Sequence, residues 1–124
     1  MPAVKRGPNG RGIRRHRGGG RMLLRPTLLL LLSEEETHGY ELYDRLTLFG
    51  FDPDCLDPSI IYRDLREMED QGLITSTWDE NSKGPKKRVY RIEEQGKIAL
   101  QDWITRLENQ QNRIQIIIER FENL

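Results

Sequence analysis

The chain has 124 residues, with 20 Lys and Arg against 20 Asp and Glu, one cysteine and a mean hydropathy of −0.74. This length suits one domain with a modest core. One cysteine cannot form an internal disulfide, no secretory signal opens the chain, and the densest apolar stretch, residues 22 to 32, is shorter than the roughly 20 residues that span a bilayer. A disulfide-rich secreted scaffold and a membrane protein are therefore excluded, and we expect a cytoplasmic protein.

The charges are unevenly distributed along the chain. Residues 1 to 21 hold seven of the 20 basic residues, six glycines and no acid, so the remainder carries 13 basic against 20 acidic residues, a net charge of −7. With so little apolar material to offset ordering entropy, we expect a disordered Gly/Arg-rich tail. Arg14, Arg15 and Arg17 are candidates for an arm that follows DNA phosphates. The alternative is a solvated tail lying partly against the acidic remainder of the chain.

Residues 22 to 95 are expected to form the folded domain, which begins with two helices. Pro26 suits the first position of a helix, and the five consecutive leucines at 28 to 32 are too apolar for a surface helix, so we expect a buried first helix ending at residue 36. A second helix should begin after Thr37 or His38, either of which can cap it, and should end at Gly50.

A third helix should follow a short turn region. Asp57 fits its N-cap, Pro58 fits its first position, and Gly72 should end it. At 100° per residue, an apolar stripe of Ile61, Leu65 and Met68 faces inward while polar residues gather on the opposite side. Ser, Tyr and Arg side chains suit phosphates and base edges, which predicts a recognition helix in a major groove. The residues of this helix expected to contact DNA are Ser59, Ile60, Tyr62, Arg63 and Arg66.

That helix has a second interpretation, as an ordinary amphipathic surface helix. The observation that favours it is a set of acids that would repel DNA, namely Asp64, Glu67, Glu69 and Asp70. Because these acids lie away from the arginines or late in the helix, we favour recognition over the bland interpretation.

The next segment has the pattern of a β-hairpin with a basic tip. Residues 73 to 78 and 87 to 92 alternate and are rich in β-forming residues, and residues 79 to 85 between them are rich in turn formers. Helix, turn, helix and hairpin in this order predict a winged helix. The residues expected to hold phosphates are Lys83, Lys86, Lys87 and Arg88. The alternative is a solvated loop whose charges guard the strand edges.

Residues 96 to 124 should form one long helix with an apolar stripe at alternating spacings of three and four. A helix of about 30 residues spans roughly 45 Å, more than so small a domain can cover, so we expect a dimerisation helix. The alternative is that its first turns fold back on the first helix. The expected dimer-interface residues are Leu100, Trp103, Ile104, Leu107, Ile114, Ile117 and Phe121. Gln110, the one polar residue of the stripe, is a candidate for setting its register.

Several motifs together resemble one known family. They are the leucines at 28 to 32, His38-Gly39-Tyr40-Glu41-Leu42, the stretch from Pro58 to Tyr62, Gly72-Leu73-Ile74 and Arg88-Val89-Tyr90-Arg91-Ile92. Over about residues 23 to 107 the chain resembles the PadR family of bacterial transcriptional regulators. The resemblance implies a dimeric winged-helix DNA-binding protein, commonly a repressor released by a small molecule, with a C-terminal dimerisation helix.

Catalysis and metal binding have little support in the sequence. The two histidines are His16 in the tail and His38 at a helix start, and Cys55 lacks the partners that a nucleophile or a zinc site needs, so we expect a structural cysteine and no cofactor. Trp103 is a candidate for lining an effector cavity between subunits, although core packing is its commoner role.

The sequence thus predicts a mainly α protein with a small β-hairpin (α+β), that is, a winged helix-turn-helix with a long C-terminal dimerisation helix. Its expected partners are double-stranded DNA and a second copy of itself. The expected function is that of a sequence-specific transcriptional regulator, a repressor responding to an unknown effector, and not an enzyme. The alternative is a protein-interaction module whose basic tail binds RNA, against which the tail's lack of aromatic residues argues.

Overall fold

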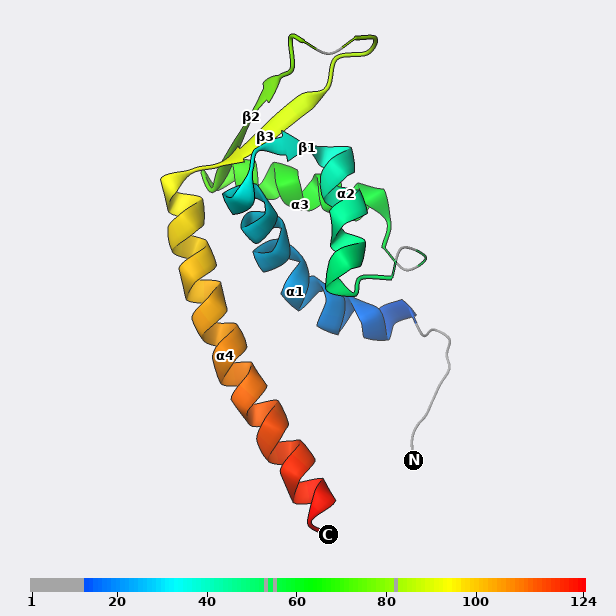
Figure 1. Cartoon of the computed structure of the whole chain (residues 1–124), viewed down its shortest axis with the longest axis vertical. Coiled ribbons are helices and arrows are strands. Elements are labelled where there is room, and N and C mark those ends of the chain that lie inside the picture. Colours follow the sequence, from blue (N-terminus) through cyan, green and yellow to red (C-terminus); the bar gives the residue numbers. More distant parts are fainter. Residues whose placement is uncertain (1–12, 53, 55, 82) are drawn as a thin grey trace.

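A computed structural model describes residues 13 to 52, 54, 56 to 81 and 83 to 124, with residues 13 to 22 described by their helical backbone only. Four α-helices, one 3₁₀ helix and three short strands make up these residues, which confirms the predicted class of a mainly helical α+β protein (Figure 1). The elements in chain order are α1 (Ile13–Glu34), β1 (Thr37–His38), α2 (Gly39–Leu46), η1 (Thr47–Phe49), α3 (Pro58–Asp70), β2 (Ile74–Trp78), β3 (Arg88–Ile92) and α4 (Glu94–Glu122).

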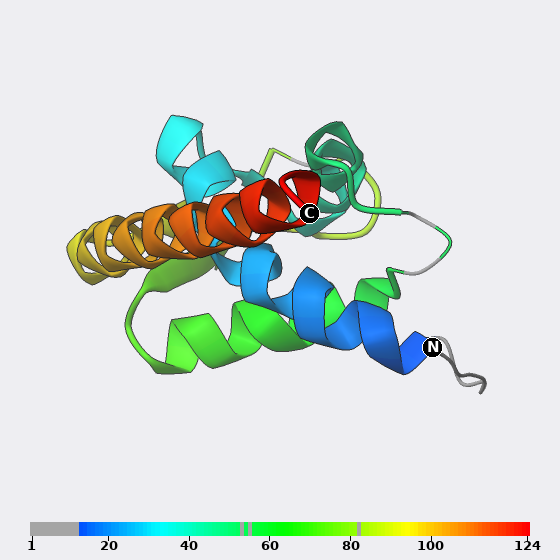
Figure 2. The same cartoon turned by 90° about the horizontal axis from the view of Figure 1, so that it is seen from below.

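Helix α1 is the centre of the fold, with α4 on one side and α2 and α3 on the other (Figures 1 and 2). Its leucines meet the apolar faces of α2 and α3 in one core, as the five-leucine run predicted. The fully buried side chains include Leu24, Leu28, Leu29, Leu42, Leu46, Ile61, Leu65, Met68 and Ile74. Removing this apolar surface from water is the main stabilising contribution to the fold.

The start of α1 differs from the prediction. Pro26 lies inside the helix and not at its first position, and residues 13 to 21, expected in the disordered tail, are helical. A proline costs a helix one backbone hydrogen bond and bends it, and α1 does bend along its length (Figure 1). The Thr27 hydroxyl donates to the carbonyl of Leu23 at 2.7 Å beside this point. Residues 1 to 12 of the expected tail lie outside the described residues.

The sheet has the order β1-β3-β2 and is antiparallel throughout. Strands β2 and β3 form the predicted hairpin, paired from Ile74 opposite Ile92 to Trp78 opposite Arg88. Strand β1, which was not predicted, adds two residues to the other edge of β3. The hairpin and its loop project from the body as the wing (Figure 1), which we define as residues 74 to 92. The wing is therefore joined to the segment that precedes α2.

Helix α4 begins against the junction between α3 and β2. The Glu93 N–H donates to the carbonyl of Leu73 at 2.9 Å, and Gly96 is buried against that same carbonyl. A side chain at Gly96 would collide with the Leu73 backbone oxygen and come within 2.7 Å of Ile92 Cγ1. Gly96, which looked like a weak point in a long helix, is therefore the residue that permits close packing of the first turn.

Candidate nucleic-acid interface

Helix α3 is held at its start by a cap and along its length by the core. The Asp57 carboxylate accepts a hydrogen bond from the Ser59 N–H at 2.9 Å, and this bond holds the pKa of Asp57 below its usual range. Pro58 occupies the first turn, as predicted. Ile61, Leu65 and Met68 are fully buried, which confirms the predicted inward face of the helix.

The opposite face of α3 is exposed to solvent. Four of the five side chains expected to contact DNA lie on this face: Ser59, Tyr62, Arg63 and Arg66. The fifth, Ile60, is only half exposed and packs against the core, so the expectation of an outward-facing Ile60 is corrected. Its place follows from helix geometry, because Ile60 is 100° from the fully buried Ile61 and lies at the border of the apolar stripe.

Most of the acids of α3 are held in contacts within the chain. Asp64 is buried and pairs with the guanidinium of Arg25 at 3.3 Å, and Glu67 pairs with the same guanidinium. The Glu69 carboxylate accepts a hydrogen bond from the Ser76 hydroxyl at 3.0 Å. The observation that favoured an ordinary surface helix is thereby weakened, because these acids are partly neutralised or directed away from the arginine face.

Tyr62 lies against the first residue of α2. A methyl group built on Gly39 would approach Tyr62 Cε1 to 2.6 Å and the Tyr62 hydroxyl oxygen to 3.2 Å. Gly39 thus leaves the room that the tyrosine ring occupies at the helix-turn-helix contact. This contact explains why a glycine follows His38, and it fixes where the phenol of the recognition face can lie.

The basic residues of the wing form two groups. Lys83 and Lys86 are exposed in the loop, as expected for phosphate-holding residues. Lys87 and Arg88 instead lie along the base of the wing, with the Lys87 ammonium 4.8 Å from the centre of the Tyr40 ring and the Arg88 guanidinium 4.5 Å from that of Trp78. The prediction of four charges at the tip therefore holds for two of them. Stacking on an aromatic face reduces the freedom of the other two side chains.

The Arg88 guanidinium also connects the wing to α3. It donates to the Ser76 hydroxyl oxygen at 2.8 Å, and the same hydroxyl donates to Glu69 on α3. Tyr90 is buried beside this chain of contacts, and burial raises the pKa of its phenol. Recognition helix and wing are therefore joined by polar contacts next to the exposed arginines.

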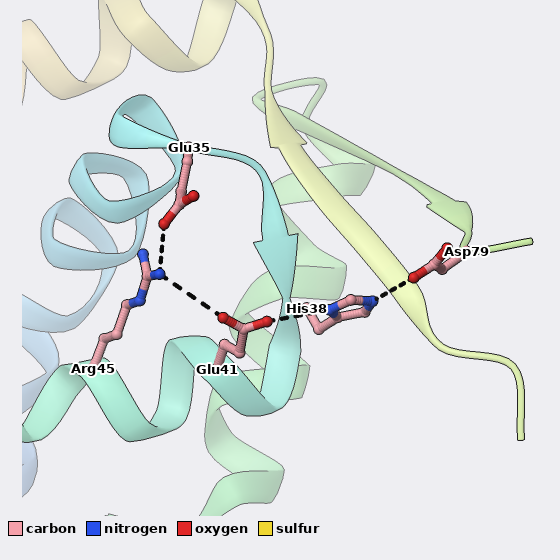
Figure 3. A network of polar contacts seen from close by, with 5 residues as sticks. All are labelled: Glu35, His38, Glu41, Arg45 and Asp79. Atoms are coloured by element: carbon pink, nitrogen blue, oxygen red, sulfur yellow. Dashed lines mark hydrogen bonds and ion pairs between the residues drawn. The ribbon is translucent and has the colours of Figure 1, made fainter. Parts of the chain in front are cut away.

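A second polar network joins the wing to α2 (Figure 3). His38 lies between the carboxylates of Glu41 and Asp79, at 3.3 and 3.0 Å, and Arg45 links Glu41 to Glu35. The hydrogen bond from the Asn81 N–H, with that to His38, holds the pKa of Asp79 below its usual range. Sequence reasoning took His38 for a helix cap and missed its link to the wing, because Asp79 is 41 residues away in the chain.

The expected dimer stripe on α4 divides into two parts. Leu100 and Trp103 pack against the core of their own chain, as the alternative of a folded-back first segment proposed, and Leu107 is half buried. Ile104 is exposed. The end of the helix carries apolar side chains that this chain does not cover, which are Ile114, Ile116, Ile117, Ile118, Phe121 and Leu124. One face of the Trp103 ring is approached by the Arg106 guanidinium, 5.2 Å from its centre.

Two further searches covered the described residues. Among them, no three His, Cys, Asp or Glu side chains gather as metal ligands would, and no helix combines the length and apolar character needed to cross a membrane. The expectation of a structural Cys55 lies outside the described residues.

The fold and this surface define a winged helix-turn-helix protein whose third helix presents Ser, Tyr and Arg side chains beside a basic wing. Residues 28–102, more than half of the chain, match the model of the transcriptional regulator PadR-like family. The chain belongs to this family, whose members are transcriptional regulators and not enzymes. The resemblance drawn from the sequence motifs is thereby confirmed.

Individual relatives agree with this assignment. Transcriptional regulator YqjI of Escherichia coli K12 is 35% identical over 121 residues, covering 90% of this chain and 52% of that regulator. The chain thus spans about half the length of the curated relatives it matches. A PadR-like transcriptional regulator from Bacillus cereus superposes with a TM-score of 0.69 and 27% identity, over 84% of this chain and 96% of that one. Bacillus subtilis PadR, solved in complex with operator DNA, superposes with a TM-score of 0.58 and 28% identity, over 66% and 46% of the two chains.

Proposed function

We propose that this chain is a homodimeric, sequence-specific DNA-binding protein that places the N-terminal half of α3 in a major groove and contacts flanking phosphates with the wing. The observation that carries the proposal is the face of α3 that bears Tyr62, Arg63 and Arg66, which is exposed while Asp64 on the same helix is buried against Arg25. The complex of Bacillus subtilis PadR with operator DNA supports duplex DNA as the ligand.

The second part of the proposal is that two copies associate through the end of α4. Ile114, Ile117 and Phe121 lie on one face of the helix and are about half exposed or more in the single chain. Such a continuous apolar face is rare on a monomer and suits a partner helix. A two-fold symmetric dimer presents two recognition helices to paired half-sites, which gives the association a use in binding DNA.

The third part concerns the tail and regulation. Arg14, Arg15 and Arg17 lie on the first turns of α1, and we propose that they approach phosphates beside the recognition helix. We further propose that the protein is a repressor and that a small-molecule effector binds near Trp103, between the subunits. A half-buried aromatic ring with a guanidinium beside it supports that site, since apolar pockets with few polar groups are the usual ligand sites.

The dimer is tested by a pair of matched substitutions on α4. Ile114 is 48% exposed on the apolar stripe, whereas Ile116 is 57% exposed and, at 100° per residue, lies on the opposite side of the helix. Ile114→Asp would bury two unpaired carboxylates per dimer and should raise the dissociation constant of the dimer about a hundredfold or more. Ile116→Asp, the control, should leave it within about threefold.

Sedimentation equilibrium gives the oligomeric state, and fluorescence anisotropy on a mixed-sequence duplex of about 30 base pairs gives DNA affinity, since this length holds two half-sites. We expect Ile114→Asp to weaken dimer and DNA binding together. A wild-type protein that is monomeric at micromolar concentration would contradict the dimer. A wild-type protein that prefers a single strand to the duplex would contradict the DNA assignment and favour the RNA-binding alternative.

A further inference from the structure

His38 occupies an unusual place for a residue that begins a helix. It lies on β1, where it pairs with Val89 of β3, and its side chain is only 18% exposed. Its ring reaches from the body of the protein to Asp79, the residue at which the loop of the wing begins (Figure 3). Its position therefore connects the wing, the sheet and α2.

Both ring nitrogens of His38 face carboxylate oxygens. Nδ1 is 3.3 Å from Glu41 Oε1 and Nε2 is 3.0 Å from Asp79 Oδ2. A carboxylate can only accept, and a neutral imidazole has one N–H, so a neutral ring donates to one of the two carboxylates and turns a lone pair towards the other. The doubly protonated ring donates to both. The number of hydrogen bonds that join the wing to α2 therefore depends on the protonation of this ring.

The charges around His38 favour the same dependence. Glu41 on α2 is 3.8 Å from Arg45, which pairs with Glu35 at the end of α1, and Asp79 faces the ring from the wing. These three carboxylates and one guanidinium carry a net charge of −2 beside a neutral ring and −1 beside a protonated one. Lys87 on β3 lies near Asp79 and adds one positive charge. The Tyr40 ring stacks on His38 at 5.4 Å and contributes no charge.

Asp79 is the residue through which such a change would reach the wing. Its N–H donates to the carbonyl of Lys87 at 2.7 Å, beyond the last paired residues of the hairpin, and its Oδ1 accepts from the Asn81 N–H at 3.0 Å. The second carboxylate oxygen faces His38. A single side chain thus anchors the start of the loop that carries Lys83 and Lys86, and His38 fixes that side chain to the body.

We propose that His38 is a positioning residue for the wing, and that protonation of its ring fixes Asp79 to Glu41 so that the affinity for duplex DNA rises as the pH falls through the titration of His38. Histidine is the side chain whose charge commonly changes between pH 5 and 8. The doubly bonded state is present at low pH and is lost as the pH rises. The dependence on DNA rests on the proposed function, whereas the coupling between ring and wing does not.

The coupling is measured without DNA, by NMR. The chain has two histidines, so the His38 ring signals are identified by comparison with His16→Gln. We expect the amide signals of Asp79 and Asn81 to shift with the same midpoint as the His38 ring, and their hydrogen exchange to accelerate above that midpoint. Amide signals that stay constant while the ring titrates would overturn the proposal.

DNA affinity is measured on the same mixed-sequence duplex at pH 6 and pH 8 at constant ionic strength. We expect the wild-type protein to bind about three- to tenfold more tightly at pH 6, the worth of one partly exposed charge-assisted hydrogen bond. His38→Gln, whose amide does not titrate, should lose this difference. His16→Gln is the matched control and should keep it. A His38→Gln protein with the full pH dependence would overturn the proposal.

Asp79→Asn gives an opposite expectation and so separates positioning from a general loss of stability. The new amide oxygen can still accept from the Asn81 N–H, while the amide nitrogen can donate to Nε2 of a neutral His38 ring. The contact should then form at high pH and break at low pH, which should abolish or reverse the wild-type difference in affinity. An unchanged dependence would overturn the proposal. If no variant binds duplex at either pH, the proposed function fails, and the NMR result alone decides the positioning role.

Discussion

Helix α3 and the wing are the two regions that face the proposed ligand, and they are held in different ways. Helix α3 is anchored by three fully buried apolar side chains and by the pair between Asp64 and Arg25. The outer half of the wing is held by polar contacts to neighbouring elements, through Asp79, Arg88 and Lys87. Apolar burial is insensitive to pH and salt, whereas exposed polar contacts respond to both. The recognition helix is therefore a fixed part of the domain, and the wing is an adjustable one.

The largest expected effect tests this difference on stability. Leu65→Ala removes a fully buried side chain of α3 and should lower the free energy of unfolding by about 2 to 5 kcal/mol. Trp78→Ala in the wing removes a half-exposed side chain and should cost less than about 1 kcal/mol. Urea unfolding followed by circular dichroism measures both. A wing substitution as destabilising as Leu65→Ala would remove the distinction.

A smaller effect should appear where α3 meets α2. In Gly39→Ala the new methyl group would collide with the Tyr62 ring, which is the end of a side chain that can turn aside. Stability should change by less than about 1 kcal/mol. Discrimination between a selected operator and a mixed-sequence duplex should fall by about tenfold, because the phenol leaves the recognition face.

Tyr62→Phe is the matched control for that substitution, since it keeps the ring in place and removes only the hydroxyl. Competition binding with the two duplexes measures the discrimination. If Gly39→Ala discriminates as well as the wild-type protein, Tyr62 is a packing residue and has no part in recognition.

The smallest effects should separate recognition from phosphate contact. Lys83→Ala and Lys86→Ala should each weaken specific and non-specific binding equally and lower the slope of log K against log salt by about 0.9. Arg63→Ala and Arg66→Ala should instead reduce discrimination between the two duplexes. Anisotropy titrations at several salt concentrations give both quantities. Equal behaviour of all four variants would show that α3 and the wing contribute in the same way.

The sequence predicted the elements whose signals are local. Asp57 and Pro58 mark the start of α3, Gly72 marks its end, and alternation with a turn-rich loop marks the hairpin, so each of these features rests on residues a few positions apart. The apolar stripe of α3 was equally accessible, because its spacing of three and four is a property of one helix. These features also gave most of the candidate DNA-contacting residues.

The features that sequence reasoning missed depend on residues far apart in the chain. Strand β1 consists of two residues and forms only because β3 lies beside it. The burial of Asp64 needs Arg25, 39 residues earlier, and the contact of His38 with Asp79 spans 41 residues. Pro26 was misplaced because its preference for a first helical turn is only a preference, and a bent helix accommodates it. Non-local polar contacts have no periodic pattern in the sequence.

The seat of α4 on the Leu73 carbonyl makes this helix a rigid lever. With Gly96 buried against that oxygen, the first turn cannot slide without displacing the junction between α3 and β2. The 29 residues of α4 extend about 44 Å at 1.5 Å per residue, so a tilt of about 5° at the fulcrum moves the far end by about 4 Å. The reverse also holds: a partner that shifts the free end by a few ångströms turns α3 by only a few degrees. The spacing between two recognition helices is thus set from the end of the molecule that lies farthest from the wing.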